Sequence, residues 1–358
     1  EFPDSPVADK IIHDFKIIEE DPEVQVVVET MGGLNPAYPF VKACLLAGKH
    51  VVTSNKALVA AYGTELLAIA KEKQVNFFFE ASVGGGIPII RPLYRCLMGE
   101  RIEEITGILN GTTNYILTKM DKEGETFENA LKEAQNLGYA ERNPEADVEG
   151  YDACRKIAIL TSLVAGKTVD FHKIHTEGIS GIDPTDFAYA KKLDATIKLL
   201  AVSRETEDGY QISVAPYLLK KENALAGVND VFNAVAVCGN TLGDTMFYGR
   251  GAGKLPTASA VVADVVECAR HLQKTVGCLW EEREAKVADF DSQEGRFFVR
   301  VLKKARADVE KVFGDVVPVV LDSALEEFAF VTESMQEAEF EKCREQIFGF
   351  VKKIRIKD

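Results

Sequence analysis

The fold is decided by the stretch 24–88, which holds three apolar runs, each followed by a polar or glycine-rich loop: VQVVVETMGG at 24–33, HVVTSNK at 50–56 and VNFFFEASVGGGIP at 75–88. Helical patterns around 38–47 and 57–73 separate these runs. Strands and helices that alternate at this spacing predict a parallel βαβαβ unit, an α/β arrangement whose ligands bind at the carboxyl ends of the strands. Three loops are therefore candidate ligand contacts: 30–33, 53–56 and 80–87.

The pattern changes after residue 101. A strand at 104–109 leads into the polar run NGTTN at 110–114, and helices follow near 127–137 and 148–164. Further strands are predicted at 198–202, 210–218, 233–237 and 245–248, which indicates an α+β domain on a sheet of its own. A helix at 258–274, rich in small and β-branched residues, is expected to pack against the first unit.

The last segment begins near residue 284 and has the order βαββαβ. Its predicted strands are 297–302, 316–321, 327–331 and 351–356, and its predicted helices are 306–313 and 337–347. This order is the ferredoxin-like plan, which by fold analogy suggests an appended regulatory module.

Composition restricts the possible partners. A chain of 358 residues is long enough for two or three domains, and no apolar run reaches the roughly eighteen residues of a membrane-spanning helix. No secretory signal is visible, and the formal charge of -14 disfavours nucleic acid and anionic membranes as partners. The seven cysteines form no C-x-x-C pair, which favours a reducing cytoplasm and argues against a transition-metal site.

Asp152 and Lys156 form the first candidate catalytic pair. They stand four residues apart in a predicted helix, so the carboxylate and the amine share one helix face. An ordinary surface ion pair, worth roughly a few tenths of a kcal/mol, also explains this spacing. The preceding loop breaks a helix at Gly138 and adds the carboxylates of Glu141 and Asp147, so these side chains are predicted to line one pocket.

Lys56 is the second candidate amine. It follows the carboxyl end of a predicted parallel strand and opposes the dipole of the helix that begins there, a misfit that favours function over a solvated surface position. Two amines beside a carboxylate suit carbonyl reduction, because hydride arrival builds negative charge on an oxygen that an ammonium stabilises and protonates. Lys56, Lys156 and an orienting Asp152 meet this requirement.

Two glycine-rich loops are further candidates. In 80–88 the glycines tolerate positive φ, so carbonyl oxygens can turn inward beside Glu80. Oxygen ligands of this kind can bind a hard cation such as sodium. A purely conformational glycine turn fits the sequence equally well. The run GRGAGKL at 249–255 has three residues, not four, between its outer glycines and has Leu after Lys, which excludes a Walker A loop. We interpret this run as a loop whose backbone amides approach a cofactor or substrate.

With these residues in view, the chain from about 24 to 274 resembles the homoserine dehydrogenase family. Similar motifs occur in the same order and spacing at 29–33, 53–56, 80–88, 110–114, 138–141, 147–156 and 249–257. The resemblance implies an enzyme that moves a hydride between NADP or NAD and the amino-acid pair aspartate semialdehyde and homoserine. It also implies a homodimer or homotetramer, a Rossmann-type nucleotide-binding domain at 1–109 and 256–280, and a catalytic and dimerisation domain at 110–255.

The resemblance further implies roles for single residues. Lys156 is expected to donate and accept the proton at the reacting oxygen, Lys56 to assist it, and Asp152 to position the substrate or the lysine. Glu141 and Asp147 are expected to hold the amino and hydroxyl ends of the substrate. The other implied contacts are the pocket residues Tyr139, Gly138 and Thr112, the cofactor contacts Met31, Gly32, Asn55, Lys56 and Gly251, and the sodium ligands Glu80, Val83, Gly85 and Ile87, the last three through backbone oxygens.

Two features depart from the family pattern. The G-x-G-x-x-G fingerprint, expected some tens of residues before residue 24, does not occur in this sequence. We expect the first βαβ part of the nucleotide-binding domain to lie outside this sequence; a chain that holds cofactor poorly is the alternative. The tail at 285–358 resembles an ACT domain, in which Asp-x-Pro-Gly often grips an amino acid, but here 303–308 reads KKARAD. A threonine effector and an assembly role are therefore both open for the tail.

Two other functions fit the same residues. One is a reductase of a related amino-acid semialdehyde, because the pocket carboxylates indicate a substrate with an ammonium group without fixing its length. The other is a non-catalytic amino-acid sensor with a disabled dehydrogenase body.

Overall fold

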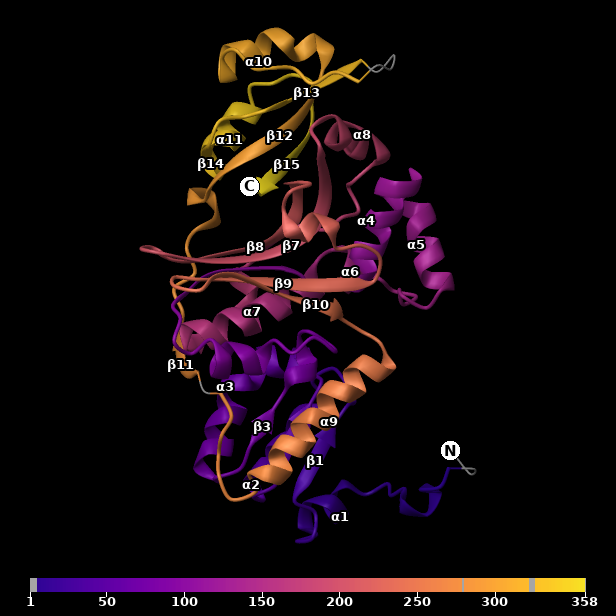
Figure 1. Ribbon diagram of the computed structural model, residues 1–358, viewed down its shortest axis with the longest axis vertical. Helices are drawn as coiled ribbons and strands as arrows, with labels where there is room; N and C mark the ends of the chain where they lie inside the picture. The colour runs from indigo at the N-terminus through magenta and orange to yellow at the C-terminus, as the bar shows by residue number, and fades with distance from the viewer. Residues whose placement is uncertain (1–4, 279, 322–325, 358) are drawn as a thin grey trace.

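Two large β-sheets organise the chain (Figure 1). The computed structural model describes residues 5–278, 280–321 and 326–357, and all candidate site residues lie in these ranges. A parallel sheet forms from the N-terminal part of the chain, and the tail lies at the opposite end of the molecule (Figure 1). Within the described residues, no helix is long and apolar enough to cross a membrane.

The N-terminal sheet has the predicted parallel order. Its strands are β1 (Val26–Glu29), β2 (His50–Thr53) and β3 (Phe77–Phe78), joined by helices α2 (Ala37–Leu46) and α3 (Lys56–Glu72). Asn55 caps α3, because its Oδ1 accepts a hydrogen bond from the Leu58 backbone N–H at 3.1 Å. The helix therefore begins at Lys56, at the carboxyl end of β2.

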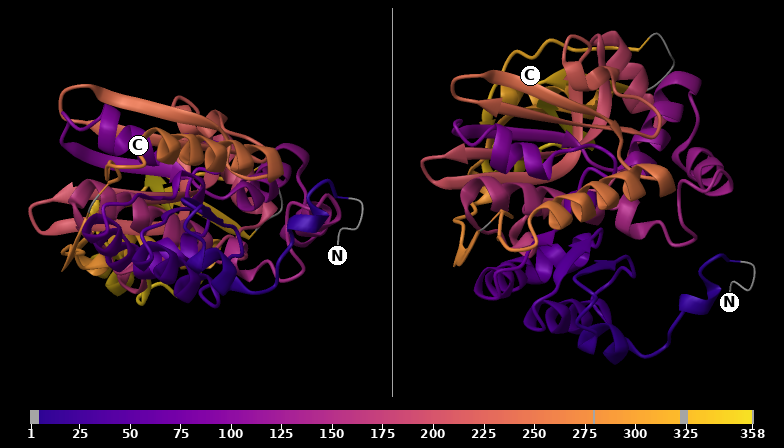
Figure 2. Two further views of the ribbon diagram at one scale, coloured as in Figure 1. Left: turned by 90° about the horizontal axis from the view of Figure 1, so that it is seen from below. Right: turned by 60° about the horizontal axis from the view of Figure 1, so that its bottom comes forward.

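Two further helices flank this sheet. α1 (Phe15–Glu20) begins at the N-cap Asp14 and packs on α2, and the segment before it lies at the periphery of the molecule (Figure 2). α9 (Lys254–Arg270) returns from the middle of the chain and contacts β1 and β2. Its Ala260, Val261 and Cys268 share a small core with Val52 and Phe78. The expected packing of this helix on the first unit is confirmed.

The second sheet has ten strands. In sheet order they are β10 (Gly243–Arg250), β9 (Phe232–Gly239), β4 (Ile102–Ile108), β7 (Ala195–Thr206), β8 (Gly209–Lys220), β15 (Phe350–Lys357), β12 (Glu294–Leu302) and β13 (Glu327–Val331), with β6 (His175–Thr176) beside β8 and β14 (Met335–Gln336) beside β12. A separate short pairing joins β5 (Lys167–Thr168) to β11 (Glu281–Glu284).

Five helices accompany the middle of this sheet: α4 (Gly111–Glu123), α5 (Phe127–Asn136), α6 (Glu145–Val148), α7 (Tyr151–Ala165) and α8 (Pro184–Lys192). α7 is the central one, since it packs on β4, β7 and β8 and also on α3 of the N-terminal unit. Its buried stretch from Asp152 to Ser162 explains the apolar pattern around the candidate pair. The contact between α3 and α7 is what brings the two candidate lysines together.

The tail adds helices α10 (Arg306–Phe313) and α11 (Glu337–Arg344) and differs from the prediction in two respects. The middle of the chain does not have a sheet of its own, because β15 pairs in parallel with β8 and joins the tail strands to it. The strand predicted at 316–321 is also wrong: Val319 makes only an isolated bridge to Ala329. Val317 and Val320 are exposed, so this segment buries too little apolar surface to hold a longer ladder there.

Candidate functional site

The two lysines meet at one carboxylate. Lys56, in the first turn of α3, places its Nζ 2.7 Å from Oδ1 of Asp152, and Lys156, one turn along α7, places its Nζ 2.7 Å from Oδ2. The Lys156 ammonium also donates to the backbone oxygen of Leu109 at the end of β4, at 2.7 Å. The structure therefore brings Lys56, Asp152 and Lys156 together, although they come from two different units of the chain.

The three side chains differ in how far they are buried. Asp152 and Lys156 are buried, whereas the Lys56 side chain is 44% exposed. Burial alone would raise the pKa of Asp152, but the charges of Lys156 and Lys56 outweigh it and hold that pKa well below its usual range. Burial would lower the pKa of Lys56, but the Asp152 charge outweighs it and holds that pKa above the ordinary value. Lys56 is thus a charged amine with an open side.

Asn110 organises the carboxylates. Its Oδ1 accepts from the Thr113 backbone N–H and caps α4, while its Nδ2 donates to Asp152 at 2.9 Å and to Asp147 at 2.8 Å. Sequence reasoning quoted Asn110 within a motif but gave it no role. An asparagine between a strand and a helix is a recognisable N-cap signal, and that signal was available in the sequence.

The predicted substrate residues lie at the edge of this cluster. Asp147, on the short helix α6, is half-buried, and burial raises the pKa of its carboxyl against the hydrogen bond from Asn110. The loop before α6 is anchored at α4, because the Thr112 hydroxyl donates to the Tyr139 backbone oxygen at 2.6 Å. Tyr139, Gly138 and Glu141 are exposed. The structure therefore joins Asp147 to Asp152 through the Asn110 amide and leaves the Glu141 carboxylate at the surface of the loop.

The predicted cofactor residues lie at the carboxyl edge of the parallel sheet. Asn55 Nδ2 donates to the Gly33 backbone oxygen at 2.6 Å, so the loops after β1 and β2 are tied together. Glu29, which sequence reasoning missed, is buried and accepts from the Met31 backbone N–H at 2.6 Å and from the Thr53 hydroxyl at 2.5 Å. Gly32 has a φ of +76° and open space around it, so its backbone is accessible to a ligand.

The two glycine-rich loops pack against each other. A Cβ at Gly85 would lie 2.2 Å from the Gly251 oxygen, and a Cβ at Gly251 would lie 2.0 Å from the Asn233 side chain. Gly86 also donates its backbone N–H to the Arg250 oxygen at 3.1 Å. These glycines permit a close backbone approach where the two units of the chain join, and Gly251 sits at that joint.

Glu80 binds the backbone just before the π-helix Pro92–Cys96. One carboxylate oxygen accepts from the backbone N–H groups of Ile89 and Ile90, and the other accepts from that of Arg91. The same residue begins the turn that carries Val83, Gly85 and Ile87. A carboxylate has about four lone-pair sites, so these three hydrogen bonds leave room for one further ligand.

A parallel sheet with open strand-end loops, next to two amines on one buried carboxylate, defines the class: a nicotinamide-dependent dehydrogenase. Residues 6–80 match the family model described as the NAD-binding domain of homoserine dehydrogenase, and residues 88–266 match the model described as homoserine dehydrogenase. The chain belongs to the homoserine dehydrogenase family. It is an NAD(P)-dependent oxidoreductase that acts on a CH–OH group and interconverts aspartate semialdehyde and homoserine.

Known homoserine dehydrogenases resemble this chain in sequence and structure along most of its length. It is 41% identical to the homoserine dehydrogenase of Synechocystis sp. over 93% of this chain and 82% of that protein, and 41% identical to that of Bacillus subtilis over 90% and 78%. The crystal structure of a homoserine dehydrogenase from Thiobacillus denitrificans superposes with a TM-score of 0.90 at 36% identity, covering 96% of this chain and 85% of that one.

Proposed function

We propose that Lys156 gives the proton to the substrate oxygen during reduction and takes it back during oxidation, that Lys56 assists, and that Asp152 positions both amines. The observation that supports this most is the contact of one buried carboxylate with both Nζ atoms at 2.7 Å. The nicotinamide cofactor supplies the hydride when bound. The two ammonium groups then stabilise the negative charge that develops on the oxygen, where a dry and fixed arrangement is worth more than it is in water.

We assign the polar end of the substrate to the carboxylates beside the amines. Asp147 is close enough to Asp152 to share the Asn110 amide, so an ammonium at Asp147 lies near the reacting centre. Glu141, from the exposed loop, and Asp147 together hold the amino and hydroxyl ends of the substrate, and Tyr139, Gly138 and Thr112 shape the pocket. The Thr112–Tyr139 hydrogen bond supports this, since it fixes the loop to the helix that Asn110 caps.

We assign NADPH or NADH to the edge formed by Met31, Gly32, Asn55, Lys56 and Gly251. The accessible backbone of Gly32 and the charged, half-exposed Lys56 suit a phosphate-bearing ligand. One hyperthermophilic archaeal homoserine dehydrogenase mutant of similar structure is described in complex with NADPH. Direct measurement of nucleotide binding to this chain is the check on this assignment.

We also propose a sodium ion at Glu80 and the backbone oxygens of Val83, Gly85 and Ile87. The remaining lone pair of Glu80 and the compact glycine turn support it. The ion would tie the turn to the sheet rather than take part in proton transfer.

The domain limits and the assembly remain our proposals. The nucleotide-binding domain comprises 1–109 and 256–280, the catalytic domain 110–255, and an ACT-like domain 285–358. The packing of α9 on β1 and β2 supports assigning 256–280 to the nucleotide-binding domain.

A homodimer or homotetramer is supported by the sheet edge β10, where Met246 and Tyr248 are exposed. Threonine is the proposed effector of the tail, and seven free cysteines support a cytoplasmic location.

The decisive variant is Lys156→Ala. We expect turnover with aspartate semialdehyde to fall by roughly 10² to 10⁴, the usual loss when general acid–base catalysis is removed. Circular dichroism should show the fold retained, and Lys167→Ala, at an intermediate position in β5, is a matched control. Turnover within a few-fold of the parent would remove Lys156 from the mechanism.

The alternatives are separated by binding and substrate length. Equal rates of NADPH oxidation with longer semialdehydes would favour a related reductase. Tight threonine binding without any nucleotide binding, measured by calorimetry, would favour the non-catalytic sensor.

A further inference from the structure

The segment 177–186 links the substrate side of the site to the tail. It runs from the end of β6 to the first turn of α8 and is held at both ends by contacts with elements that are distant in sequence. One end lies against α6, which carries Asp147. The other end lies against β12 and β15, the two longest strands of the tail.

At the first end, the segment contacts α6 through backbone atoms. The Ile179 N–H donates to the Val148 oxygen at 2.8 Å, and Val148 directly follows Asp147. Gly178 lies flat against the same helix: an added Cβ would be 2.5 Å from the Val148 oxygen and 2.4 Å from a carboxylate oxygen of Glu149. This segment therefore holds α6 from one side, through a contact that tolerates no side chain, while α4 and α7 pack on it from others.

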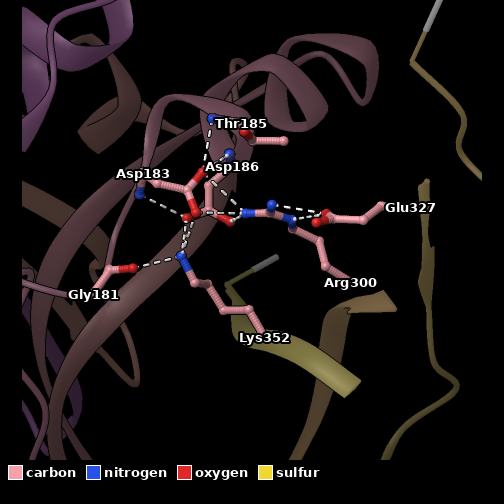
Figure 3. A network of polar contacts seen from close by, with 7 residues as sticks. All are labelled: Gly181, Asp183, Thr185, Asp186, Arg300, Glu327 and Lys352. Carbon is pink, nitrogen blue, oxygen red and sulfur yellow. Dashed lines mark hydrogen bonds and ion pairs between the residues drawn. The ribbon is translucent and has the colours of Figure 1, made fainter. Parts of the chain in front are cut away.

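At the second end, a buried ionic network fixes the segment (Figure 3). Arg300 of β12 reaches Asp183 at 2.9 Å and Asp186 at 2.5 Å, and its other nitrogen pairs with Glu327 at 2.8 Å. Lys352 of β15 approaches the same two aspartates, at 3.0 and 2.5 Å. Asp186 is fully buried and Arg300 nearly so, so their pair is shielded from the screening that weakens surface pairs, whereas the Asp183 side chain is 41% exposed.

Two further contacts extend the attachment. Lys352 donates to the Gly181 backbone oxygen, and Arg355 of β15 pairs with Glu177 at 2.9 Å. Burial would raise the pKa of Glu177, but the hydrogen bond from His175 and the charge of Arg355 outweigh it and lower it to about 2. The segment is thus tied to the tail at its beginning, middle and end.

We infer that the segment 177–186 positions Asp147, so that the tail strands β12 and β15 help to set the affinity for substrate. This rests on the proposed role of Asp147 toward the ammonium group. Gly178 and Lys352 are positioning residues in this scheme, since neither touches the reacting atoms. The chemistry at Lys156 should depend on them less, because α7 packs on β4, β7 and β8 as well as on α6.

A pair of glycine substitutions tests the first end. Gly178→Ala should raise the KM for L-homoserine about ten- to a hundred-fold, the size expected when a hydrogen bond to a charged substrate group is lost, while kcat and the KM for the nucleotide change little. Gly181→Ala is the matched control, because an added Cβ there meets nothing within 4 Å. Equal KM values for the two variants would overturn the inference.

Substitutions at Lys352 test the second end and serve also if Gly178→Ala fails to fold. Lys352→Met should raise the KM for L-homoserine and speed hydrogen exchange at the Ile179 amide, and Lys352→Arg should restore both. A lowered melting temperature with unchanged KM and unchanged exchange would mean a merely structural role and would also overturn the inference.

Asp147→Asn keeps the two proposals apart. If it leaves the KM unchanged, the assigned role of Asp147 fails, while hydrogen exchange at Ile179 still reports whether the tail holds the segment. If Asp147→Asn raises the KM and Gly178→Ala does not, only the positioning inference fails.

Discussion

Asp147 and Asp152 are two carboxylates held by one amide, and their surroundings shift their pKa values in opposite directions. Two ammonium groups hold the pKa of Asp152 well below its usual range, whereas burial raises that of Asp147. Asp152 therefore remains a fixed counter-charge for the lysines. Asp147 carries a charge that is costly until a cation arrives, which suits a group that binds the substrate's ammonium.

The raised pKa of Asp147 predicts an acid limb in substrate binding. As the pH falls through this pKa, which lies above the ordinary aspartate value of 3.8, the carboxylate takes up a proton and the KM for L-homoserine should rise. Asp147→Asn should have a high KM at every pH and lose this limb, whereas Glu145→Gln, at an exposed position on the same helix, should keep it. Steady-state kinetics between roughly pH 4 and 8 measures both. An unchanged acid limb in Asp147→Asn would contradict the assignment.

Local spacing predicted only part of this site. The four-residue interval gave the Asp152–Lys156 contact, and the strand-end position of Lys56 indicated the second amine. The hydrogen bonds of Asn110 and Glu29 join residues that are distant in sequence, and their detection required the packing of α3 on α7 and of the two strand-end loops.

Helices and strands with a regular apolar pattern were predicted well, whereas the helices α4 and α8, whose starts are set by N-cap residues, were missed. α4 was not predicted, because Gly111, Thr112 and Thr113 favour a helix weakly, but the Asn110 cap and burial override that preference. α8 was missed although Asp183 forms a capping box with Asp186 and Pro184 occupies the first turn, both recognisable signals. The strand predicted at 316–321 shows the reverse error, because its β-branched residues fit a strand but Val317 and Val320 remain exposed.

The cap of α8 also predicts how the tail contact responds to acid. Burial would raise the pKa of Asp183, but hydrogen bonds from Arg300 and Lys352 outweigh it and lower it to about 2. A depressed pKa stabilises the fold above the unfolded value near 3.8, and this contribution is lost as the pH falls toward 2. Asp183→Asn keeps a good N-cap, so its free energy of unfolding should lie below the parent's above pH 4 and approach it near pH 2.

Urea unfolding at several pH values measures this difference. Asp208→Asn provides the control, because the Asp208 side chain is 92% exposed in a hairpin turn and should give no pH-dependent gap. A constant gap for Asp183→Asn from pH 5 to 2 would show that the network does not depend on this charge.

At the scale of the whole molecule, the joint between body and tail is a continuous sheet. β15 pairs with β8 in the register Arg355 to Tyr217, and Phe298, Ala329 and Ile354 of the tail belong to the same buried cluster as the core of the body. The sequence predicted three of the tail strands, β12, β13 and β15, but not this joint, because nothing in a single strand specifies which neighbour will cover its edge. An appended module would instead meet the body through a small and separable interface.

This continuity predicts that body and tail unfold together. Trp280, the chain's single tryptophan, donates to the Thr64 hydroxyl at 2.7 Å and packs against Gly63 in α3, so its fluorescence reports on the body. Hydrogen exchange at the amides of β12 reports on the tail. In one urea series the two probes should share a midpoint, since breaking the β8–β15 pairing exposes core residues on both sides. If β12 opens at clearly lower urea while the Trp280 signal stays native, the tail is a separable domain, and any influence on Asp147 must pass through the ionic network alone.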